Sequence, residues 1–402
     1  MATGTAVFPH MPALKGVSIG VSSAGIKTPG RKDVVVFEFS PATTMAGVFT
    51  RNAFCAAPVT LAKESLAQVQ PHYWLINTGN ANAGTGEQGL ADAKACTQAL
   101  AGLKNVQAGQ VLPFSTGVIG ELLPVDKITQ ALPAALDTLS DDNWEEAAAG
   151  ILTTDTRPKG ATRTIDTING SITINGISKG SGMICPNMAT MLAFVATDAS
   201  IEQERLQALL KEATEYSFNR ITVDSDTSTN DACVLAATHQ GPVLAGGDDE
   251  AAFAKALHEV MLELAQAIVR DGEGATKFIT VDVQEARDSQ EALAVAFSIA
   301  HSPLVETALY ASDANWGRLL MAVGKADIKA LDVNQVSIRL NDVLIAENGA
   351  RAAGYTEEQG SQALQSEEIH VEVKLARGTV QEKVWTSDLS HEYVSINADY
   401  RS

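Results

Sequence analysis

The sequence predicts an α/β protein in which helices and sheets are stacked in layers. Short apolar runs bounded by turn residues alternate with longer helical stretches along the chain. Residues 191–197 are almost continuously apolar and end at Asp198, as expected of a strand buried on both faces. The glycine-rich segment 179–188 leads into this strand, and Pro186 favours a bent loop there. Helices and strands on both sides of one buried strand therefore favour packed α and β layers.

The composition is that of a soluble globular protein. The 402 residues are 45% hydrophobic and 19% charged, which suits one large domain or two to three smaller ones. The formal net charge of −19 argues against nucleic acid or an anionic membrane as a partner, whereas small cations would be attracted. The N-terminus lacks a basic region followed by an apolar core, and no 18 apolar residues run together. We therefore expect a cytoplasmic protein.

Metal and redox chemistry are not indicated by the cysteines or histidines. The four cysteines form no CxxC pair, and the seven histidines fall in no metal-like or triad-like cluster. We expect free thiols, no metal and no resident cofactor.

The first half of the chain carries clear strand and helix patterns. Strands are expected at 16–21, 34–39, 47–50, 73–76 and 111–114, and a helix at 87–103. Residues 123–150 are expected to be helical, with a break at 140–143 that should cap the second helix. Asn169-Gly170 predicts a hairpin between strands at 164–168 and 171–177.

Three polar stretches of this half are expected to be loops. Residues 77–86 contain many turn formers but neither a P-loop lysine nor GxGxxG, so a structural loop is favoured over phosphate binding. Residues 115–120 are expected to form a turn after the strand, and 153–156 a polar loop.

The second half continues with helices at 203–216, 251–269 and 289–300 and a strand at 278–283. Glu273 is expected in a tight turn between two elements. Residues 221–231 look like a calcium loop but lack its sixth-position glycine and terminal glutamate, so we reject that interpretation. The C-terminal third is expected to be mostly strands, at 336–345, 369–375 and 380–385.

The junction between Ala189 and Thr190 suits self-cleavage. The Thr190 hydroxyl can attack the preceding carbonyl, and hydrolysis of the resulting ester leaves threonine as a new N-terminus. Its α-amine, with a reference pKa of about 7.7 to 8.0, can act as base for its own hydroxyl. An ordinary glycine- and proline-containing loop before a core strand would show the same residues, so the residues alone leave both interpretations open.

A resemblance to a known family favours self-cleavage. Residues 179–192, Lys-Gly-Ser-Gly-Met-Ile-Cys-Pro-Asn-Met-Ala-Thr-Met-Leu, resemble the self-cleavage segment of the ornithine acetyltransferase, or glutamate N-acetyltransferase, family of arginine biosynthesis. Cys185 departs from the small apolar residue often found there, and we assign it no function. Further segments are similar to family motifs in the same order: 50–59, 77–83, 115–120, 153–156, 224–231, 271–277, 315–318 and 397–402. The resemblance covers essentially the whole chain.

The resemblance implies a fold and an assembly. The family fold is a four-layer αββα sandwich with a smaller additional domain. Self-cleavage would give an alpha chain, residues 1–189, and a beta chain, residues 190–402, which form one intertwined unit. Two copies of each are expected to assemble as an α2β2 heterotetramer.

The resemblance also implies an activity. The enzyme is expected to move the acetyl group of N2-acetylornithine to glutamate through acetyl-Thr190, with Thr116 and Gly117 as the oxyanion hole. The substrate-binding residues would be Thr156, Lys179, Thr190, Glu273, Asn397 and Ser402. Whether acetyl-CoA serves as a second donor remains open.

Two other classes of function compete with this one. An N-terminal-nucleophile amidohydrolase or aminopeptidase would use water as the acceptor, and a non-catalytic small-molecule binding protein would need no nucleophile. Segments 179–192 and 397–402 argue against the first class. The intact Thr116, Gly117, Lys179 and Thr190 argue against the second.

Overall fold

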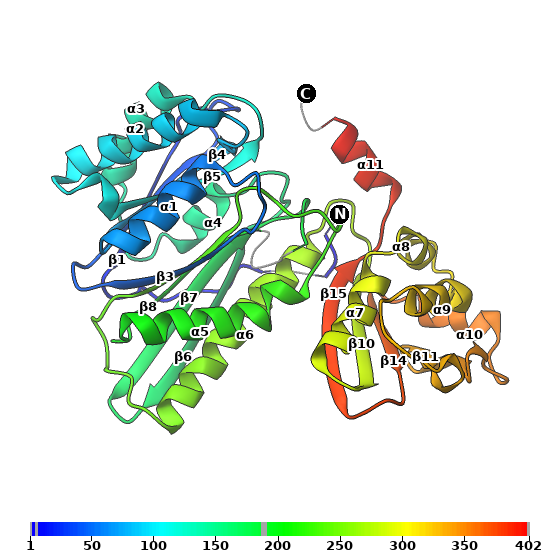
Figure 1. Cartoon of the computed structure of the whole chain (residues 1–402). Helices are drawn as coiled ribbons and strands as arrows, with labels where there is room; N and C mark the ends of the chain where they lie inside the picture. Colours follow the sequence, from blue (N-terminus) through cyan, green and yellow to red (C-terminus); the bar gives the residue numbers. More distant parts are fainter. Residues whose placement is uncertain (1, 5–6, 186–190, 400–402) are drawn as a thin grey trace. The chain divides into compact units, whose positions relative to one another are not determined.

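Two facing β-sheets form the centre of the larger of two structural units (Figure 1). The computed structural model describes residues 2–4, 7–185 and 191–399, and this unit spans 7–219 and 226–268. The four-stranded sheet has the order β1 (Val17–Ser22), β2 (Val34–Phe39), β4 (Tyr73–Asn80), β5 (Val111–Val118). The five-stranded sheet has the order β3 (Thr44–Phe49), β9 (Ala232–Ala237), β8 (Leu192–Thr197), β7 (Gly170–Lys179), β6 (Lys159–Thr167).

Strand β8 is the central strand of the five-stranded sheet, as its apolar sequence predicts. All six of its residues are buried. It pairs antiparallel with β7, where Leu192 lies opposite Lys179, and parallel with β9, where Leu192 lies opposite Ala232. This register places the end of β7 and the start of β9 on either side of Leu192.

Aromatic side chains fill the space between the two sheets. Phe194 of β8 is fully buried, and its ring centroid lies 5.1 Å from that of Phe114, 5.6 Å from Trp74 and 6.0 Å from Phe37. These three partners come from β5, β4 and β2 of the opposite sheet. Because apolar area is removed from water on both inner faces, this cluster holds the sheets together.

Helices cover the outer faces of both sheets and complete four layers (Figure 1). Helices α2 (Gly86–Lys104) and α3 (Val125–Asp137) share an apolar cluster with β2 and β4. On the other side, α6 (Asp248–Arg270) brings Val260 and Leu264 against Gly176 of β7, and α5 (Gln203–Glu215) packs on β3. Helices α1 (Ala57–Gln68) and α4 (Trp144–Gly150) belong to the same unit. The αββα sandwich is therefore confirmed.

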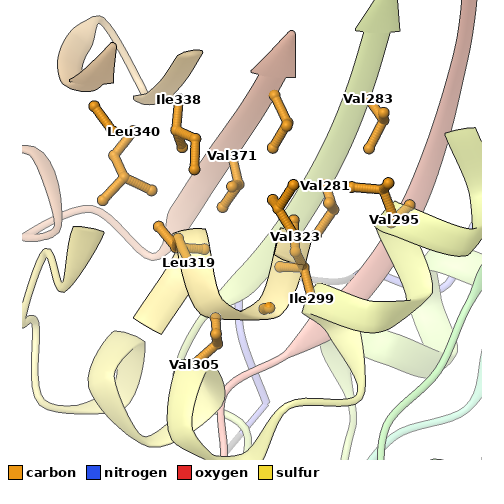
Figure 2. Packing of buried hydrophobic residues seen from close by; sticks show 14 of the residues in the cluster. Val281, Val283, Val295, Ile299, Val305, Leu319, Val323, Ile338, Leu340 and Val371 are labelled. Atoms are coloured by element: carbon orange, nitrogen blue, oxygen red, sulfur yellow. The ribbon is translucent and has the colours of Figure 1, made fainter. Parts of the chain in front are cut away.

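The smaller unit, with described residues 2–4, 220–225 and 269–399, has its own sheet and core. Figure 2 shows that Val281 of β10 (Phe278–Ala286), Ile338 of β11 (Ser337–Leu340) and Val371 of β14 (Glu368–Lys374) pack with Leu319 of α9 (Trp316–Gly324) in one apolar cluster. The strand order is β13 (Ala350–Arg351), β12 (Val343–Glu347), β11 (Ser337–Leu340), β14 (Glu368–Lys374), β10 (Phe278–Ala286), β15 (Val380–Ser387). Its helices are α7 (Ser289–Ala300), α8 (Pro303–Tyr310), α9 (Trp316–Gly324), α10 (Glu357–Ala363) and α11 (His391–Ala398).

The structure corrects several expectations. The C-terminal third is not mostly strands, because α8 to α11 lie in it. The expected strand 336–345 is a hairpin, β11 and β12, that turns at Asn341 with φ +48°. Asn143 precedes α4 but does not cap it with its side chain, which donates to the backbone oxygens of Ile19 and Thr138 instead.

Within the described residues no single helix is both long and apolar enough to cross a membrane. Helices α7 and α8, bent by 58° at the break between them, meet that criterion of length and composition only when taken together. Both contribute buried residues to the core of the smaller unit.

Replacement of Phe194 by alanine should lower the free energy of unfolding by about 3–5 kcal/mol, because it leaves a cavity between the sheets. Phe54→Ala is the matched control, since Phe54 is 77% exposed. Chemical denaturation followed by circular dichroism measures both. Equal midpoints for the two variants would contradict the central packing role of Phe194.

Candidate active site

The predicted oxyanion residues Thr116 and Gly117 lie inside a strand. We expected a turn at 115–120, but β5 continues to Val118, paired with β4, so that Thr116 lies opposite Thr78 and Gly117 opposite Gly79. The strand pairing outweighs the local turn preference of glycine. Thr116 is buried at 8% exposure, so its hydroxyl is fixed within the fold.

Gly117 is required by the close approach of β4. Its φ is +135°, and a Cβ there would lie 2.3 Å from the carbonyl carbon of Gly79 and 2.5 Å from the nitrogen of Asn80. Any larger residue would therefore collide with backbone. The close approach of β4 is therefore the reason for glycine at this position that the structure shows.

Asparagine side chains hold the end of β4 and the stretch that follows it. Asn77 accepts the Ser115 hydroxyl at 2.6 Å and donates to the backbone oxygen of Asn80 at 2.9 Å. Asn82 is fully buried and donates to the backbone oxygen of Gly89 at 2.8 Å. The expected structural role is consistent with these contacts, although β4 itself extends to Asn80.

Lys179, the last residue of β7, reaches the predicted oxyanion residue on the other sheet. Its Nζ donates to Thr116 Oγ1 at 3.1 Å and to Thr153 Oγ1 at 2.8 Å. Because Thr116 Oγ1 accepts this hydrogen bond, its own hydrogen is directed elsewhere and can be donated to another acceptor. The structure thus brings together two of the predicted site residues, Thr116 and Lys179.

Asp155 organises the loop beside Lys179. Its side chain is fully buried, and Oδ1 accepts from Lys159 Nζ at 2.6 Å and from the backbone N–H of Gly180 at 2.7 Å. Oδ2 accepts from the backbone N–H of Thr153 at 3.0 Å and from its hydroxyl at 3.4 Å. Burial alone would raise the pKa of Asp155, but the charges of Lys159 and Lys179 hold it below the usual carboxyl range.

A second contact joins the same loop to the glycine-rich segment. Thr154 Oγ1 and Ser181 Oγ lie 2.7 Å apart, and Ser181 is buried. Gly180 has φ +150°, which confirms the expected glycine-specific backbone there. Thr156, predicted to contact substrate, is exposed at the end of this loop.

Asp231, the last residue of the family motif 224–231, is a buried carboxyl that was not among the predicted site residues. It is 2% exposed and immediately precedes β9. Burial raises its pKa well above the usual range, while hydrogen bonds from Ser228 and the charge of Lys179 act in the opposite direction. Its Oδ2 has no hydrogen-bond partner among the described residues.

In the smaller unit, two predicted substrate-binding residues contact each other. Glu273 lies in the expected turn between α6 and β10, but it is 7% exposed rather than solvated. Its Oε2 accepts a hydrogen bond from Asn397 Nδ2 of α11 at 2.7 Å. An anionic oxygen held by an amide donor is suited to bind an ammonium group.

The remaining predicted residues, Ala189, Thr190 and Ser402, lie outside the described residues. The fragment boundary between 189 and 190 is therefore untested. Sequence reasoning also missed Asp155 and Lys159 as individual site residues, although the Thr-Thr-Asp-Thr motif contained Asp155.

Other reactive groups contribute less to the candidate site. Across residues 2–4, 7–185 and 191–399, no three His, Cys, Asp or Glu side chains are grouped to hold a metal ion. Burial raises the pKa of Cys96, beside Asp92, and of Cys233 to about 12, so both thiols stay protonated at neutral pH.

Comparison with known proteins finds a family model and two relatives that match almost all of the chain or all of it. A family model described as the ArgJ family matches residues 18–402. The arginine biosynthesis bifunctional protein ArgJ of Pseudomonas fluorescens is 56% identical over 406 residues, and the protein of that name from Pseudomonas syringae pv. tomato is 55% identical. Each alignment covers 100% of both chains. The crystal structure of arginine biosynthesis bifunctional protein ArgJ from Bacillus halodurans is 40% identical, covers 50% of this chain and 95% of that chain, and has a TM-score of 0.48.

The family match and the full-length identities agree with the order of motifs read along the sequence. The chain therefore belongs to the ArgJ family, which confirms the family membership that its motifs predict.

Proposed function

We propose that this protein is an acyltransferase of arginine biosynthesis that moves the acetyl group of N2-acetylornithine to glutamate. The products are ornithine and N-acetylglutamate. The observation that carries the proposal is the hydrogen bond from Lys179 to Thr116, because it joins a cation to a hydroxyl whose own hydrogen is available for an oxyanion. The bifunctional ArgJ relatives, identical at 55–56% of positions over their full length, support the same activity.

The proposed reaction has two acyl transfers at one nucleophile. The Thr190 hydroxyl attacks the acetyl carbonyl of acetylornithine, its proton passes through the α-amine to the leaving ornithine nitrogen, and the amide bond breaks. The glutamate amine then attacks the acetyl ester, the bond to Thr190 oxygen breaks, and a proton from the attacking amine returns through the α-amine to that oxygen. Thr116 and Gly117 would stabilise both oxyanions, each donor contributing about 3–4 kcal/mol in the transition state.

Charge would orient the two amino-acid substrates. Glu273, held by Asn397, suits an ammonium group, while Lys179 suits an anionic group. Thr156, Thr190 and Ser402 would complete substrate binding. Acetylornithine and glutamate share an α-carboxylate, which allows one set of contacts to serve both.

The word bifunctional in the names of the relatives supports acetyl-CoA as a second acetyl donor. We further propose that the chain cleaves itself between Ala189 and Thr190, that its fragments assemble as an α2β2 heterotetramer in the cytoplasm, and that it needs no metal or resident cofactor. An N-terminal-nucleophile amidohydrolase, which would pass the acyl group to water, lacks support from these full-length relatives.

Self-cleavage should divide the purified chain into fragments 1–189 and 190–402. Denaturing electrophoresis and N-terminal sequencing should find threonine at the start of the second fragment. Thr190→Ala should stay uncut because it lacks the hydroxyl, whereas Thr190→Ser, which retains one, should still be cut. A fully active enzyme that remains one intact chain would contradict this prediction.

Loss of the Glu273 carboxylate should weaken transition-state binding of acetylornithine. Glu273→Ala is expected to lower kcat/KM for acetylornithine by an amount equivalent to about 2–5 kcal/mol, if the ion pair with the substrate is desolvated. Glu358→Ala on α10 is the control, because Glu358 is exposed and belongs to no family motif quoted above. If both variants match wild type, Glu273 does not bind the substrate.

Both donors should give acetylglutamate through one acetyl-enzyme. Acetylornithine and acetyl-CoA are each supplied with glutamate, and mass spectrometry follows the fragment that begins at Thr190. Parallel double-reciprocal plots and acetylation of this fragment are expected, because ornithine must leave before glutamate enters. Acetate release that does not depend on glutamate, or intersecting plots, would exclude this mechanism.

A further inference from the structure

Helix α11 is attached to the smaller unit by contacts at particular points rather than by a buried apolar face. None of its eight residues is buried, and the Val394 side chain is 65% exposed. A helix of this length is not stable on its own in water, because its few backbone hydrogen bonds do not offset the cost of starting the helix. The position of α11 therefore depends on the individual bonds that its residues make.

The start of α11 rests on the turn that carries Glu273. The Ser390 hydroxyl, buried just before the helix, donates to the backbone oxygen of Gly274 at 2.7 Å. Gly274 has φ +72°, and a Cβ there would lie 2.6 Å from the backbone nitrogen of Tyr393. The turn and the first residues of the helix are thus in direct backbone contact, which glycine makes possible.

Two side chains on one face of α11 continue this attachment. Tyr393 and Asn397 are four residues apart, so they lie one above the other on the helix. The Tyr393 hydroxyl donates to Asp224 Oδ2 at 3.2 Å, and Asn397 Nδ2 donates to Glu273 Oε2 at 2.7 Å. Asp224 belongs to the segment 220–225 of the same unit. The helix is therefore bonded to carboxyl groups from two separate segments.

The backbone of Tyr393 also orients the Asn397 amide. Nδ2 of Asn397 donates to the backbone oxygen of Tyr393 at 3.0 Å as well as to Glu273. An amide nitrogen carries two hydrogens, so each acceptor takes one of them. A shift of Tyr393 would therefore turn or withdraw the hydrogen that reaches Glu273.

We propose that Tyr393 is a positioning residue, whose hydrogen bond to Asp224 keeps α11 in the place from which Asn397 reaches the Glu273 carboxylate. The proposal rests on the acetyl-transfer function given above, in which Glu273 binds an ammonium group of the substrate. A carboxylate whose orientation is fixed beforehand loses less freedom when the ammonium group arrives, and this strengthens binding.

Hydrogen exchange tests the anchoring of α11 without any substrate. Tyr393→Phe keeps the ring and removes one oxygen, so it removes the bond to Asp224. The backbone amides of residues 395–398 should exchange about 3- to 10-fold faster than in wild type, as expected for the loss of one hydrogen bond. Tyr310→Phe is the matched control, because it removes the same atom from a tyrosine that contacts α11 through its ring, 5.8 Å from that of His391. It should exchange as wild type does.

Activity tests whether Tyr393 acts through Asn397. Tyr393→Phe should lower kcat/KM for acetylornithine by about 3- to 10-fold, mainly through KM, because it weakens substrate binding. In an Asn397→Ala background, which lacks the amide, the same change should have little further effect. A purely structural role of Tyr393 would give equal losses in both backgrounds.

Unchanged exchange at residues 395–398 in Tyr393→Phe would overturn the anchoring, and equal losses of kcat/KM in the two backgrounds would overturn the positioning role. Losses in Tyr310→Phe as large as those in Tyr393→Phe would also contradict the proposal, because the bond to Asp224 would then not be their cause. Wild-type enzyme that forms no acetylglutamate would instead refute the proposed function, and hydrogen exchange would still decide whether Tyr393 anchors α11.

Discussion

The buried carboxylate of Asp155 is the interaction on which the candidate site of the larger unit depends. It receives donors from Lys159 at the start of β6, from Thr153 in the preceding loop and from Gly180 after β7. Removal of one partner from a buried ion pair costs about 3–5 kcal/mol, because the other charge is left without compensation. One side chain therefore fixes three segments that are separate in sequence, and through Gly180 it fixes the beginning of the segment that leads to Thr190.

Lys179 connects the segments held by Asp155 to the other sheet. It ends β7 in the five-stranded sheet, and its ammonium contacts Thr116 in the four-stranded sheet and Thr153 in the loop. The aromatic cluster around Phe194 fixes the separation of these sheets. A lysine-to-hydroxyl contact of 3.1 Å across a sandwich is possible only when that separation is set by rigid packing, so the core directly determines the geometry of the site.

The sequence pattern predicted those helices, strands and turns that depend on interactions between residues close together in the chain. The apolar run of β8, the Asn169-Gly170 hairpin and the amphipathic helix α5 all follow from short-range periodicity or turn chemistry. The family motifs identified the site residues, but not the residues that hydrogen-bond to them.

The extension of β5 through Gly117 depends on pairing with β4, and the burial of Asp231 depends on contacts of Asn230 with residues more than 100 positions away. Contacts between residues so far apart in the chain cannot be predicted from a short window of sequence. The short helices α8 and α9 were missed for a different reason, because each is only eight or nine residues long.

Satisfied polar groups make the surroundings of the site rigid. The asparagines of 77–82, the hydroxyls of Thr153 and Thr154 and both oxygens of Asp155 all have hydrogen-bond partners. Fixed dipoles of this kind stabilise a developing charge without having to reorganise during the reaction. Among the described residues, only four buried side-chain nitrogen or oxygen atoms lack a hydrogen-bond partner: Trp144 Nε1, Asp231 Oδ2, Thr386 Oγ1 and Ser387 Oγ. Asp231 is the only carboxyl among these four residues. In an interior where other polar groups are paired, an acid without a donor at one oxygen is most stable when that oxygen carries a proton, because protonation removes the charge that burial penalises.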